Sequence, residues 1–490
     1  MRILLIVLLL IVAANCSVVN TKTTKEGLLP IGGLSRDLET DRGIDKNLVT
    51  TLDTRTTVFE SRKSDGLEEV SSNVVPAHSK HVLPLFDGIR NPAGQIYRRA
   101  LGADGDDGST TAGSIPIKSI KDEVFLTTVK IGNQDFTLLI DVGSADTWVA
   151  MSGIKCAQRS GIFAAVLDLS LGKLNCRFGN TYKNSSTFTQ VPNQHFSTAY
   201  SDGGYARGIM GKETLTLGNL TVEQQPIGFA NMAAWTGDGM SSGILGLAFP
   251  SITNAYAGTT IAKEKKLEGP RVPYPPIFTN MYRQKLIKPY FSMALNRASE
   301  GPGALAFGGL PGGNFRHTGN FTPAPLQQFA GTKLPPPGVM VEDGLKDFRF
   351  YVVNTDGFTV NSQPAIRGNG SMQVVVDSGS RLVHLPSKIV EAIAKKWQPP
   401  ATLEPLTGNY IVNCTGTPPK VGVVFGGASI SMDKEDLFLK TGGNMCISTI
   451  QKSPGDDSKG QWILGAPFLR SVIAIFDVGA AEMRFVKRVR

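Results

Sequence analysis

Two short segments with nearly the same pattern, one in each half of the chain, constrain this sequence most. Residues 138–150 read LLIDVGSADTWVA, and residues 374–386 read VVVDSGSRLVHLP. In both, an apolar run typical of a buried strand ends in Asp-x-Gly-Ser, which places Asp141 and Asp377 at strand ends. A single ionised carboxylate would be unfavourable to bury there. Two such acids that face each other can share one proton, because like charges in contact do not both ionise.

A second pair of segments repeats in the same order. Gly243-Ile-Leu-Gly246 follows the first Asp motif, and Ile463-Leu-Gly465 follows the second. Internal repetition of this kind predicts two similar lobes.

The composition favours an all-β protein with a few short helices. The chain has 490 residues, enough for more than one domain, and its 54 Gly and 29 Pro indicate many turns. Alternating patterns predict strands at 125–131, 135–140, 208–217 and 220–230. Helices are expected at 276–286 and 387–397, the second capped by Ser387. A Pro-rich stretch at 323–338 predicts a surface connection near the middle of the chain.

The N-terminal region is expected to be processed. Residues 1–16 have the charged start, apolar centre and small-residue end of a signal peptide, with cleavage after Ala14 or Cys16 equally suitable. Residues 17–99 are polar and poor in aromatics, which predicts a partly disordered prosegment that ends at the dibasic pair Arg98-Arg99. The expected lobes are 100–320, with the first Asp motif, and 321–490, with the second. The expected destination is outside the cell, with the vacuole as the alternative.

Four cysteines remain after the signal region, and they allow three disulfide pairings. We favour the two short-range pairs, because each closes a loop within one half of the chain: Cys156–Cys176 and Cys414–Cys446. Five sequons fit a secreted glycoprotein: Asn184, Asn219, Asn320, Asn369 and Asn413.

The charge pattern does not indicate a nucleic-acid partner. The formal charge is +9, but the basic residues are scattered, without a basic block or interleaved aromatics. The five His show no metal-site spacing, so no metal or other cofactor is expected. No segment after the signal region is apolar enough to span a bilayer.

The paired motifs resemble those of the pepsin-type aspartic endopeptidases (A1 family), particularly the secreted fungal members, over residues 120–488. In that family each lobe supplies one Asp-Thr/Ser-Gly-Ser/Thr loop, and an Ile-Leu-Gly segment runs beside it. Trp148 matches the family's Trp after the first loop, and the two favoured cysteine pairs fall where the family has disulfides. The resemblance implies a bilobal pepsin-like fold.

The resemblance also implies the site. Asp141 and Asp377 would activate a water molecule, with Ser144 and Ser380 bonded to their outer oxygens. Loop residues would support this dyad: Gly143, Ser144, Ser378, Gly379 and Ser380. Tyr200 would lie at the tip of the flap, a β-hairpin over the cleft; the alternative is a Tyr in an ordinary hairpin. Asp202, beside Gly203, would pair with a substrate Lys; the alternative is a turn-forming Asp.

Two positions depart from the family pattern. Val142 stands where the family usually has a Thr that forms a hydrogen bond across the lobes, and Ser378 is expected to keep half of that contact. Arg381 stands where Ser or Thr is usual; it would either lower the pKa of Asp377 or point to solvent.

The sequence therefore predicts a secreted, monomeric endopeptidase that acts on polypeptides in acid and binds pepstatin-like inhibitors. It would prefer hydrophobic residues, and Lys if Asp202 acts as described, before the scissile bond. One alternative is a pepsin-fold binding protein with weak or no catalysis, supported mainly by Val142. Another is a glycosidase that uses the same acid pair, but such enzymes do not need mirrored Gly-flanked acids, and the sequence has no aromatic platform for sugar.

Overall fold

The structure is a computed structural model of the chain. It describes residues 81–90, 96–98, 123–157, 176–200, 204–235, 239–258, 270–300, 302–311, 315–328, 348–365, 371–405, 407–440, 445–453 and 461–490.

The described chain is mostly β-structure, as the sequence predicts. The strands before residue 330 are β1 (His81–Arg90), β2 (Ile96–Arg98), β3 (Glu123–Ile131), β4 (Gln134–Asp141), β5 (Trp148–Cys156), β6 (Thr189–Ala199), β7 (Tyr205–Leu217), β8 (Leu220–Ala234), β9 (Gly243–Gly246), β10 (Ala255–Ala257), β11 (Tyr290–Ala294), β12 (Gly303–Phe307) and β13 (Thr322–Pro325). The later strands are β14 (Val352–Thr355), β15 (Gly357–Val360), β16 (Gln363–Pro364), β17 (Met372–Val376), β18 (Val383–Leu385), β19 (Thr402–Leu403), β20 (Tyr410–Asn413), β21 (Val421–Phe425), β22 (Ala428–Ser431), β23 (Phe438–Lys440), β24 (Met445–Ser448), β25 (Ile450–Lys452), β26 (Ile463–Leu464), β27 (Val472–Asp477) and β28 (Glu482–Lys487).

Helices are few and short. The α-helices in the described ranges are α3 (Ile277–Arg283), α4 (Ser387–Ala394) and α5 (Ala466–Arg470). Single 3₁₀ turns lie at η2 (Pro250–Ile252), η3 (Ala298–Glu300) and η5 (Lys434–Asp436).

Most predicted elements are confirmed, with two corrections. The four predicted strands lie within β3, β4, β7 and β8, and the two predicted helices are α3 and α4. Ser387 is not the cap of α4: Pro386 holds that place, and its carbonyl accepts from the backbone N–H groups of Ile389 and Val390. The Pro-rich stretch does not begin as a surface connection, because Thr322–Pro325 pairs with β28 and Ala324 is buried. A strand at the sheet's end tolerates proline, since one side needs no N–H donor.

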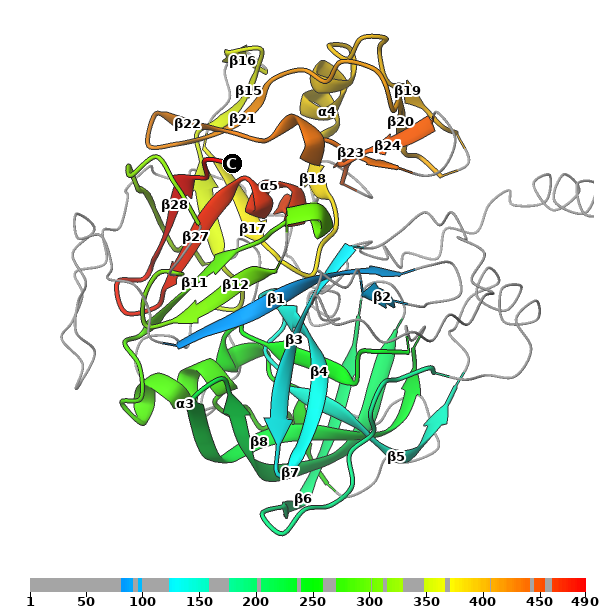
Figure 1. Cartoon of the computed structure of the whole chain (residues 1–490), viewed down its shortest axis with the longest axis vertical. Coiled ribbons are helices and arrows are strands. Elements are labelled where there is room, and N and C mark those ends of the chain that lie inside the picture. Colours follow the sequence, from blue (N-terminus) through cyan, green and yellow to red (C-terminus); the bar gives the residue numbers. More distant parts are fainter. Residues whose placement is uncertain are drawn as a thin grey trace, which may run out of the picture.

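One large sheet runs through both halves of the chain. Its strand order is β10-β6-β7-β8-β5-β9-β4-β3-β1-β12-β11-β27-β28-β13, with β2 paired to β1. In Figure 1, β3 to β10 form the lower part of the molecule, and β1 crosses between them and the strands of the upper part. The upper part adds three small sheets, ordered β14-β17-β26-β18-β25, β16-β15-β21-β22 and β19-β20-β24-β23. This two-part arrangement is the bilobal fold that the resemblance implies.

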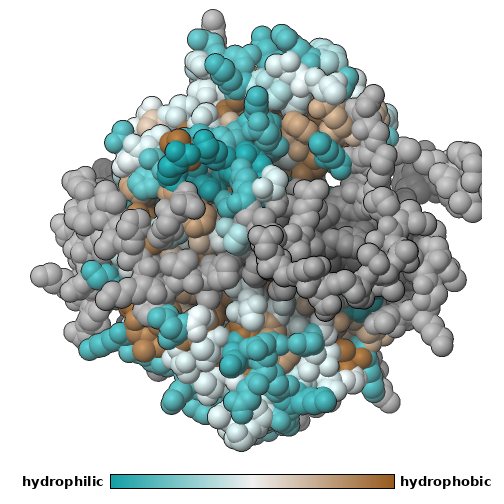
Figure 2. Space-filling view, in the orientation of Figure 1, coloured by the Kyte–Doolittle hydropathy of each residue, from teal (hydrophilic) through white to brown (hydrophobic). Residues whose placement is uncertain are grey.

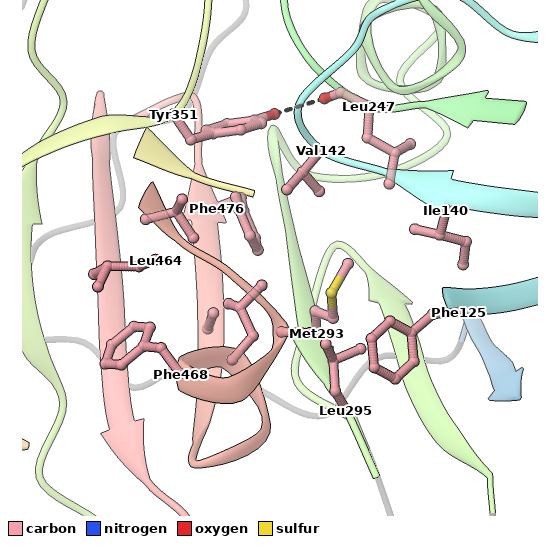
Figure 3. Close-up of a cluster of buried hydrophobic side chains, with 14 of the residues drawn as sticks. Phe125, Ile140, Val142, Leu247, Met293, Leu295, Tyr351, Leu464, Phe468 and Phe476 are labelled. Atoms are coloured by element: carbon pink, nitrogen blue, oxygen red, sulfur yellow. Dashed lines mark hydrogen bonds between the residues drawn. The ribbon is translucent and has the colours of Figure 1, made fainter. Parts of the chain in front are cut away.

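A hydrophobic cluster fills the junction of the two parts. Figure 3 shows side chains from both sides pointing together, among them Val142 and Leu247 from the first half and Phe468 from the second. The Tyr351 hydroxyl donates to the carbonyl of Leu247 at 2.8 Å, so the two halves share a hydrogen bond inside this cluster. Burial on this scale holds the two Asp loops in fixed relation.

The structure contains both favoured disulfides, Cys156–Cys176 and Cys414–Cys446. Hydrophobic side chains are scattered on the face in Figure 2. The large hydrophobic residues exposed in the described ranges are Leu286, Leu403, Met445 and Val489. None of the described helices has the length and apolar character needed to cross a bilayer.

Candidate active site

Each motif Asp is positioned by a strand pair of the same form. In the first half, β4 runs parallel to β9, and Asp141 lies opposite Gly246. In the second half, β17 runs parallel to β26, and Asp377, just beyond β17, donates its N–H to the carbonyl of Leu464 at 3.1 Å. The apolar run of each motif is thus a buried strand that ends at the acid, as the sequence predicts.

The glycine that follows each Ile-Leu pair allows the neighbouring loop to approach closely. A β-carbon on Gly246 would lie 2.5 Å from the carbonyl carbon of Ala145, and one on Gly465 would lie 2.2 Å from the carbonyl oxygen of Leu382. Contacts this short exclude any larger residue. The glycine repeat found in the sequence therefore fits a steric requirement of both loops.

The two motifs meet at their carboxyl groups. Asp141 and Asp377 are both buried, and each carboxyl group acts on the pKa of the other. Each motif glycine faces the carboxyl group of the opposite loop. A β-carbon on Gly143 would lie 2.5 Å from Oδ1 of Asp377, and one on Gly379 would lie 2.7 Å from Oδ1 of Asp141. Two buried carboxyl groups this close do not both ionise, so the geometry favours a pair that holds one proton.

Burial raises the pKa of both acids, but unequally. At Asp141, burial raises the pKa, while hydrogen bonds from Ser144 and Gly143 oppose the rise. At Asp377, burial raises the pKa furthest, and the negative charge of Asp141 raises it again. Asp377 therefore holds the shared proton more tightly, and Asp141 is the group that ionises more readily.

The two motif serines differ, although the sequence predicts equivalent roles for them. The Ser144 hydroxyl donates to Oδ2 of Asp141 at 2.6 Å. The Ser380 hydroxyl instead donates to the carbonyl of Leu382 at 2.9 Å. Oδ2 of Asp377 is buried and has no hydrogen-bond partner in the described chain. The missing donor adds to the preference of Asp377 for its protonated form.

Ser378 ties the two loops together. Its hydroxyl accepts from the backbone N–H of Val142 and donates to the carbonyl of Ile140, both at 3.1 Å. Val142 contributes no hydroxyl, and its side chain is fully buried in the junction cluster of Figure 3. The hydrogen bonds expected from the Ser378 hydroxyl are thus present. The hydroxyl that a Thr at position 142 would supply is replaced by the hydrophobic packing of Val142.

The pKa of Asp377 is raised, and Arg381 is not among the main influences on it. Arg381 does act on His384: burial, with a smaller contribution from the charge of Arg381, lowers the pKa of His384 to about 4. His384 is buried, and its Nδ1 lies 3.3 Å from the carbonyl of Lys452. The buried, neutral imidazole of His384 therefore contributes to the packing of the core and not to the chemistry of the dyad.

The predicted flap residue Tyr200 is buried close to the dyad. Its hydroxyl accepts from Nε1 of Trp148 at 2.8 Å. Burial raises the pKa of Tyr200 well above its ordinary value, and the charges of Asp146 and Asp141 add to the rise. The adjoining Trp235 contacts both rings edge-on, with centroids at 5.8 Å from Tyr200 and 5.5 Å from Trp148. Asp202 and Gly203 lie outside the described residues.

Sequence reasoning missed a third buried acid, Asp146, which follows the first motif by two residues. Its Oδ1 accepts from the Asn254 backbone N–H at 2.8 Å and from the Tyr274 hydroxyl at 2.7 Å, and its Oδ2 accepts from the Asn254 amide at 2.6 Å. Burial nevertheless raises the pKa of Asp146 to about 6, although the charge of Arg271 opposes the rise. The only signal in the sequence was an acid inside the apolar segment after the first motif.

Residues 124–488 match the family described as eukaryotic aspartyl protease. The chain belongs to this family. The protease is 37% identical to a probable aspartic-type endopeptidase of Aspergillus fumigatus over 383 residues, which covers 76% of this chain and 81% of that protein. It is 26% identical to pepsin A of the bat Rhinolophus ferrumequinum, over 79% of this chain and 85% of that protein.

A solved structure shows the same fold. The aspartic proteinase from Irpex lacteus aligns with a TM-score of 0.55 at 18% identity, covering 74% of this chain and 94% of that one. The protease is thus an aspartic-type endopeptidase of bilobal pepsin-like fold, whose substrates are polypeptides. Within the described ranges, no group of three or more His, Cys, Asp or Glu side chains is placed to bind a metal ion.

Proposed function

We propose that this protease hydrolyses peptide bonds at acidic pH with a water molecule activated between Asp141 and Asp377. The observation that carries the proposal is the pair of buried carboxyl groups, each next to the motif glycine of the opposite loop, with unequal surroundings. Two such groups with pKa values set apart by their environments can act as base and acid in one reaction.

The unequal surroundings assign the two roles. Ionised Asp141, stabilised by Ser144 and Gly143, takes a proton from the water as its oxygen attacks the peptide carbonyl carbon. Protonated Asp377 donates to the carbonyl oxygen, and a gem-diol forms. The diol collapses as the C–N bond breaks: Asp141 gives the proton it took from the water to the leaving nitrogen, and Asp377 recovers a proton from a diol hydroxyl. No covalent enzyme intermediate and no cofactor are needed.

The need to keep one proton on the pair sets an upper limit to the pH at which the reaction can run. Loss of the proton from Asp377 removes the general acid and places two negative charges in contact. The hydrogen bonds to Asp141 work in the opposite sense, because they keep this carboxyl ionised as the pH falls. The active form therefore lies between the ionisation of Asp141 and that of Asp377.

The surroundings of Tyr200 support a preference for hydrophobic residues before the scissile bond. Tyr200 lies within electrostatic reach of Asp141, and the neighbouring rings of Trp148, Phe178 and Trp235 are in mutual contact. Aromatic surroundings of this kind favour apolar side chains. Asp202, two residues after Tyr200, is the proposed partner for a substrate Lys.

We also propose that the protein is a secreted, glycosylated monomer inhibited by pepstatin-like compounds. The apolar N-terminal segment, the two disulfides and the exposed sequon residues Asn184, Asn219, Asn320 and Asn413 support this proposal. Asn369 lies outside the described residues. The vacuole is the second candidate for its destination.

The test is hydrolysis of a denatured protein by the purified secreted form between pH 2.5 and 8, with and without pepstatin. We expect cleavage on the acid side of neutrality that pepstatin blocks. Asp141→Asn and Asp377→Asn should each reduce kcat by at least about 1,000-fold without loss of cooperative unfolding. Cleavage near the wild-type rate by either variant would refute the dyad. No cleavage by correctly folded wild type would favour a binding protein with this fold.

A further inference from the structure

Asp146 is a buried acid that the proposed mechanism does not use, and it belongs to the same loop as Asp141. The backbone carbonyl of Asp146 accepts from the N–H of Gly246 at 3.2 Å, and that of Asp141 accepts from the N–H of Leu247 at 2.9 Å. Both acids are therefore fixed to one short segment of backbone. A carboxyl group buried this deeply needs hydrogen-bond partners, so its partners indicate what Asp146 holds in place.

The main partner of Asp146 is Asn254, which contacts both carboxyl oxygens. The backbone N–H of Asn254 donates to Oδ1 at 2.8 Å, and its side-chain amide donates to Oδ2 at 2.6 Å. The other end of the amide is also bound, because Oδ1 of Asn254 accepts from the Tyr256 hydroxyl at 3.2 Å and from Nη2 of Arg271 at 3.4 Å. The amide is thus held in one orientation, with its NH₂ group towards Asp146.

Asn254 is in turn bound to strand β6, which leads into the flap. The carbonyl of Asn254 accepts from the backbone N–H of Ser197 at 3.2 Å, and its amide donates to the Thr198 hydroxyl at 3.4 Å. The residues after Asn254 pair with the same strand: β10 runs antiparallel to β6, with Ala255 opposite Phe196. A single residue therefore connects the loop of the first motif to the flap strand.

This connection reaches the flap next to its tyrosine. β6 ends at Ala199, and Tyr200 follows, two residues after Thr198. The charge of Asp146 and the side chain of Thr198 both act on the pKa of Tyr200, so the three groups are neighbours. Trp148, two residues after Asp146, donates to the Tyr200 hydroxyl at 2.8 Å. The loop therefore holds the flap at two points, the tyrosine hydroxyl through Trp148 and strand β6 through Asp146.

Tyr274 is the other partner of the Asp146 carboxyl group. Its hydroxyl donates to Oδ1 of Asp146 at 2.7 Å, and its backbone N–H donates to the Thr253 hydroxyl at 3.0 Å. Tyr274, Thr253 and Asn254 are all buried. Loss of the carboxyl group would remove the acceptor of the Tyr274 hydroxyl and of the Asn254 backbone N–H in a place that water does not readily reach.

We propose that Asp146 is a positioning residue for substrate binding: through Asn254 it fixes the flap strand and Tyr200 relative to the dyad. This proposal rests on the proposed role of Tyr200 as a substrate-binding residue of the flap. In this scheme Asp146 touches neither the attacking water nor the scissile bond. Its loss would weaken the binding of substrate and of transition state equally, which raises KM and leaves kcat nearly unchanged.

The first experiment compares two variants of similar shape at position 146. Asp146→Leu offers no polar atom to Asn254 and Tyr274, whereas Asp146→Asn keeps one acceptor oxygen. KM and kcat are measured with the purified secreted protease at pH 4, on a quenched fluorescent peptide with Phe before the scissile bond. We expect Asp146→Leu to raise KM by about 10-fold with kcat within about 2-fold of the wild type, and Asp146→Asn to restore KM to within about 2-fold. A fall in kcat at unchanged KM, or equal KM values in the two variants, would overturn the proposal.

A second variant tests whether Asp146 acts through Asn254. Asn254→Ala should raise KM by itself, and it should add little to Asp146→Leu, because both changes interrupt one connection. Fully additive effects would refute that connection.

Asp436→Asn is the matched control for loss of a buried acid. Asp436 lies in η5 and pairs with Arg297 and Arg470 in another part of the fold. The control should leave KM unchanged. A rise in KM equal to that of Asp146→Leu would mean that general loss of stability sets KM, which would contradict the proposal.

Hydrogen–deuterium exchange tests the connection without catalysis. In Asp146→Leu, the amides of residues 189–200 should exchange about 10-fold faster than in the wild type, and those of β27 at the wild-type rate. Unchanged exchange in residues 189–200 would count against the proposal. If Asp146→Leu does not fold, Asn254→Ala carries the same two measurements.

The two readouts separate this proposal from the catalytic one. If the wild type cleaves no peptide, the catalytic proposal fails, and the exchange of residues 189–200 still decides whether Asp146 holds the flap strand. Peptidase activity in the wild type, with wild-type KM and exchange in Asp146→Leu, would refute the positioning role alone.

Discussion

Gly143 and Asp377 are in contact across the lobe junction: a β-carbon on the glycine would lie 2.5 Å from Oδ1 of the acid. Gly143→Ala should therefore displace one carboxyl group from the other. A shift near 1 Å reduces activity by about 100-fold, so we expect a fall in kcat of at least that size. The reciprocal variant Gly379→Ala, at 2.7 Å from Asp141, should behave in the same way. Wild-type kcat in either folded variant would show that the contact does not position the dyad.

Ser378 should contribute strongly to stability through its two hydrogen bonds across the junction. Ser378→Ala leaves the Val142 N–H and the Ile140 carbonyl without their partner. The free energy of unfolding should fall by about 1–3 kcal/mol. Urea denaturation at pH 5 measures the change, and Ser378→Thr, which keeps the hydroxyl, is the matched control. Equal loss in both variants would mean that packing, and not hydrogen bonding, decides the effect.

Val142→Thr tests the other side of the same contact. A threonine has nearly the shape of valine and adds a hydroxyl that can reach across the junction. We expect stability to rise by about 1 kcal/mol, the net value of a typical hydrogen bond. A fall in stability would show that the junction cluster around residue 142 accepts no polar atom.

The two motif serines should affect the pH profile differently. Ser144 donates to Asp141, and that bond lowers the pKa of the carboxyl. Ser144→Ala should therefore raise the pKa of Asp141 and move the acid limb of the kcat/KM profile to higher pH. Ser380→Ala is the control, since its hydroxyl donates to Leu382 and not to Asp377. Equal shifts in both variants would contradict the asymmetry.

Asp146 should make the fold less stable as the pH rises. Burial raises its pKa from 3.8 to about 6. A group whose pKa is higher in the folded state stabilises the fold fully below pH 3.8, and this contribution is lost as the pH rises through 6. The difference amounts to about 3 kcal/mol at most. Asp146→Asn resembles the protonated acid and should flatten the stability profile between pH 4 and 7. Asp135→Asn, at an exposed position, should leave its shape unchanged.

The dyad could be predicted because the same motif occurs once in each half of the chain. Each Asp-x-Gly-Ser motif follows an apolar strand. Each motif glycine is required because the opposite carboxyl group leaves no room for a side chain, and the sequence shows this requirement in both halves. The direction of the Ser380 hydroxyl could not be predicted, because a rotation about one bond decides between Leu382 and Asp377. The partners of Asp146 could not be predicted either, because Asn254 and Tyr274 are more than a hundred residues away along the chain. The place of β1 in the sheet could not be predicted, because the polar composition of the surrounding residues 17–99 indicated disorder and not a strand.

The single hydroxyl at the junction has a consequence for how such a site can change over time. Had the two lobes been identical subunits of a dimer, one substitution of hydroxyl by valine would have appeared on both sides and removed the contact entirely. Here the two copies are joined in one gene product, so the first could become Val142 while the second stayed Ser378. Because the two lobes belong to one chain, a substitution can change one loop alone, while the hydroxyl of the other loop keeps the hydrogen bonds across the junction.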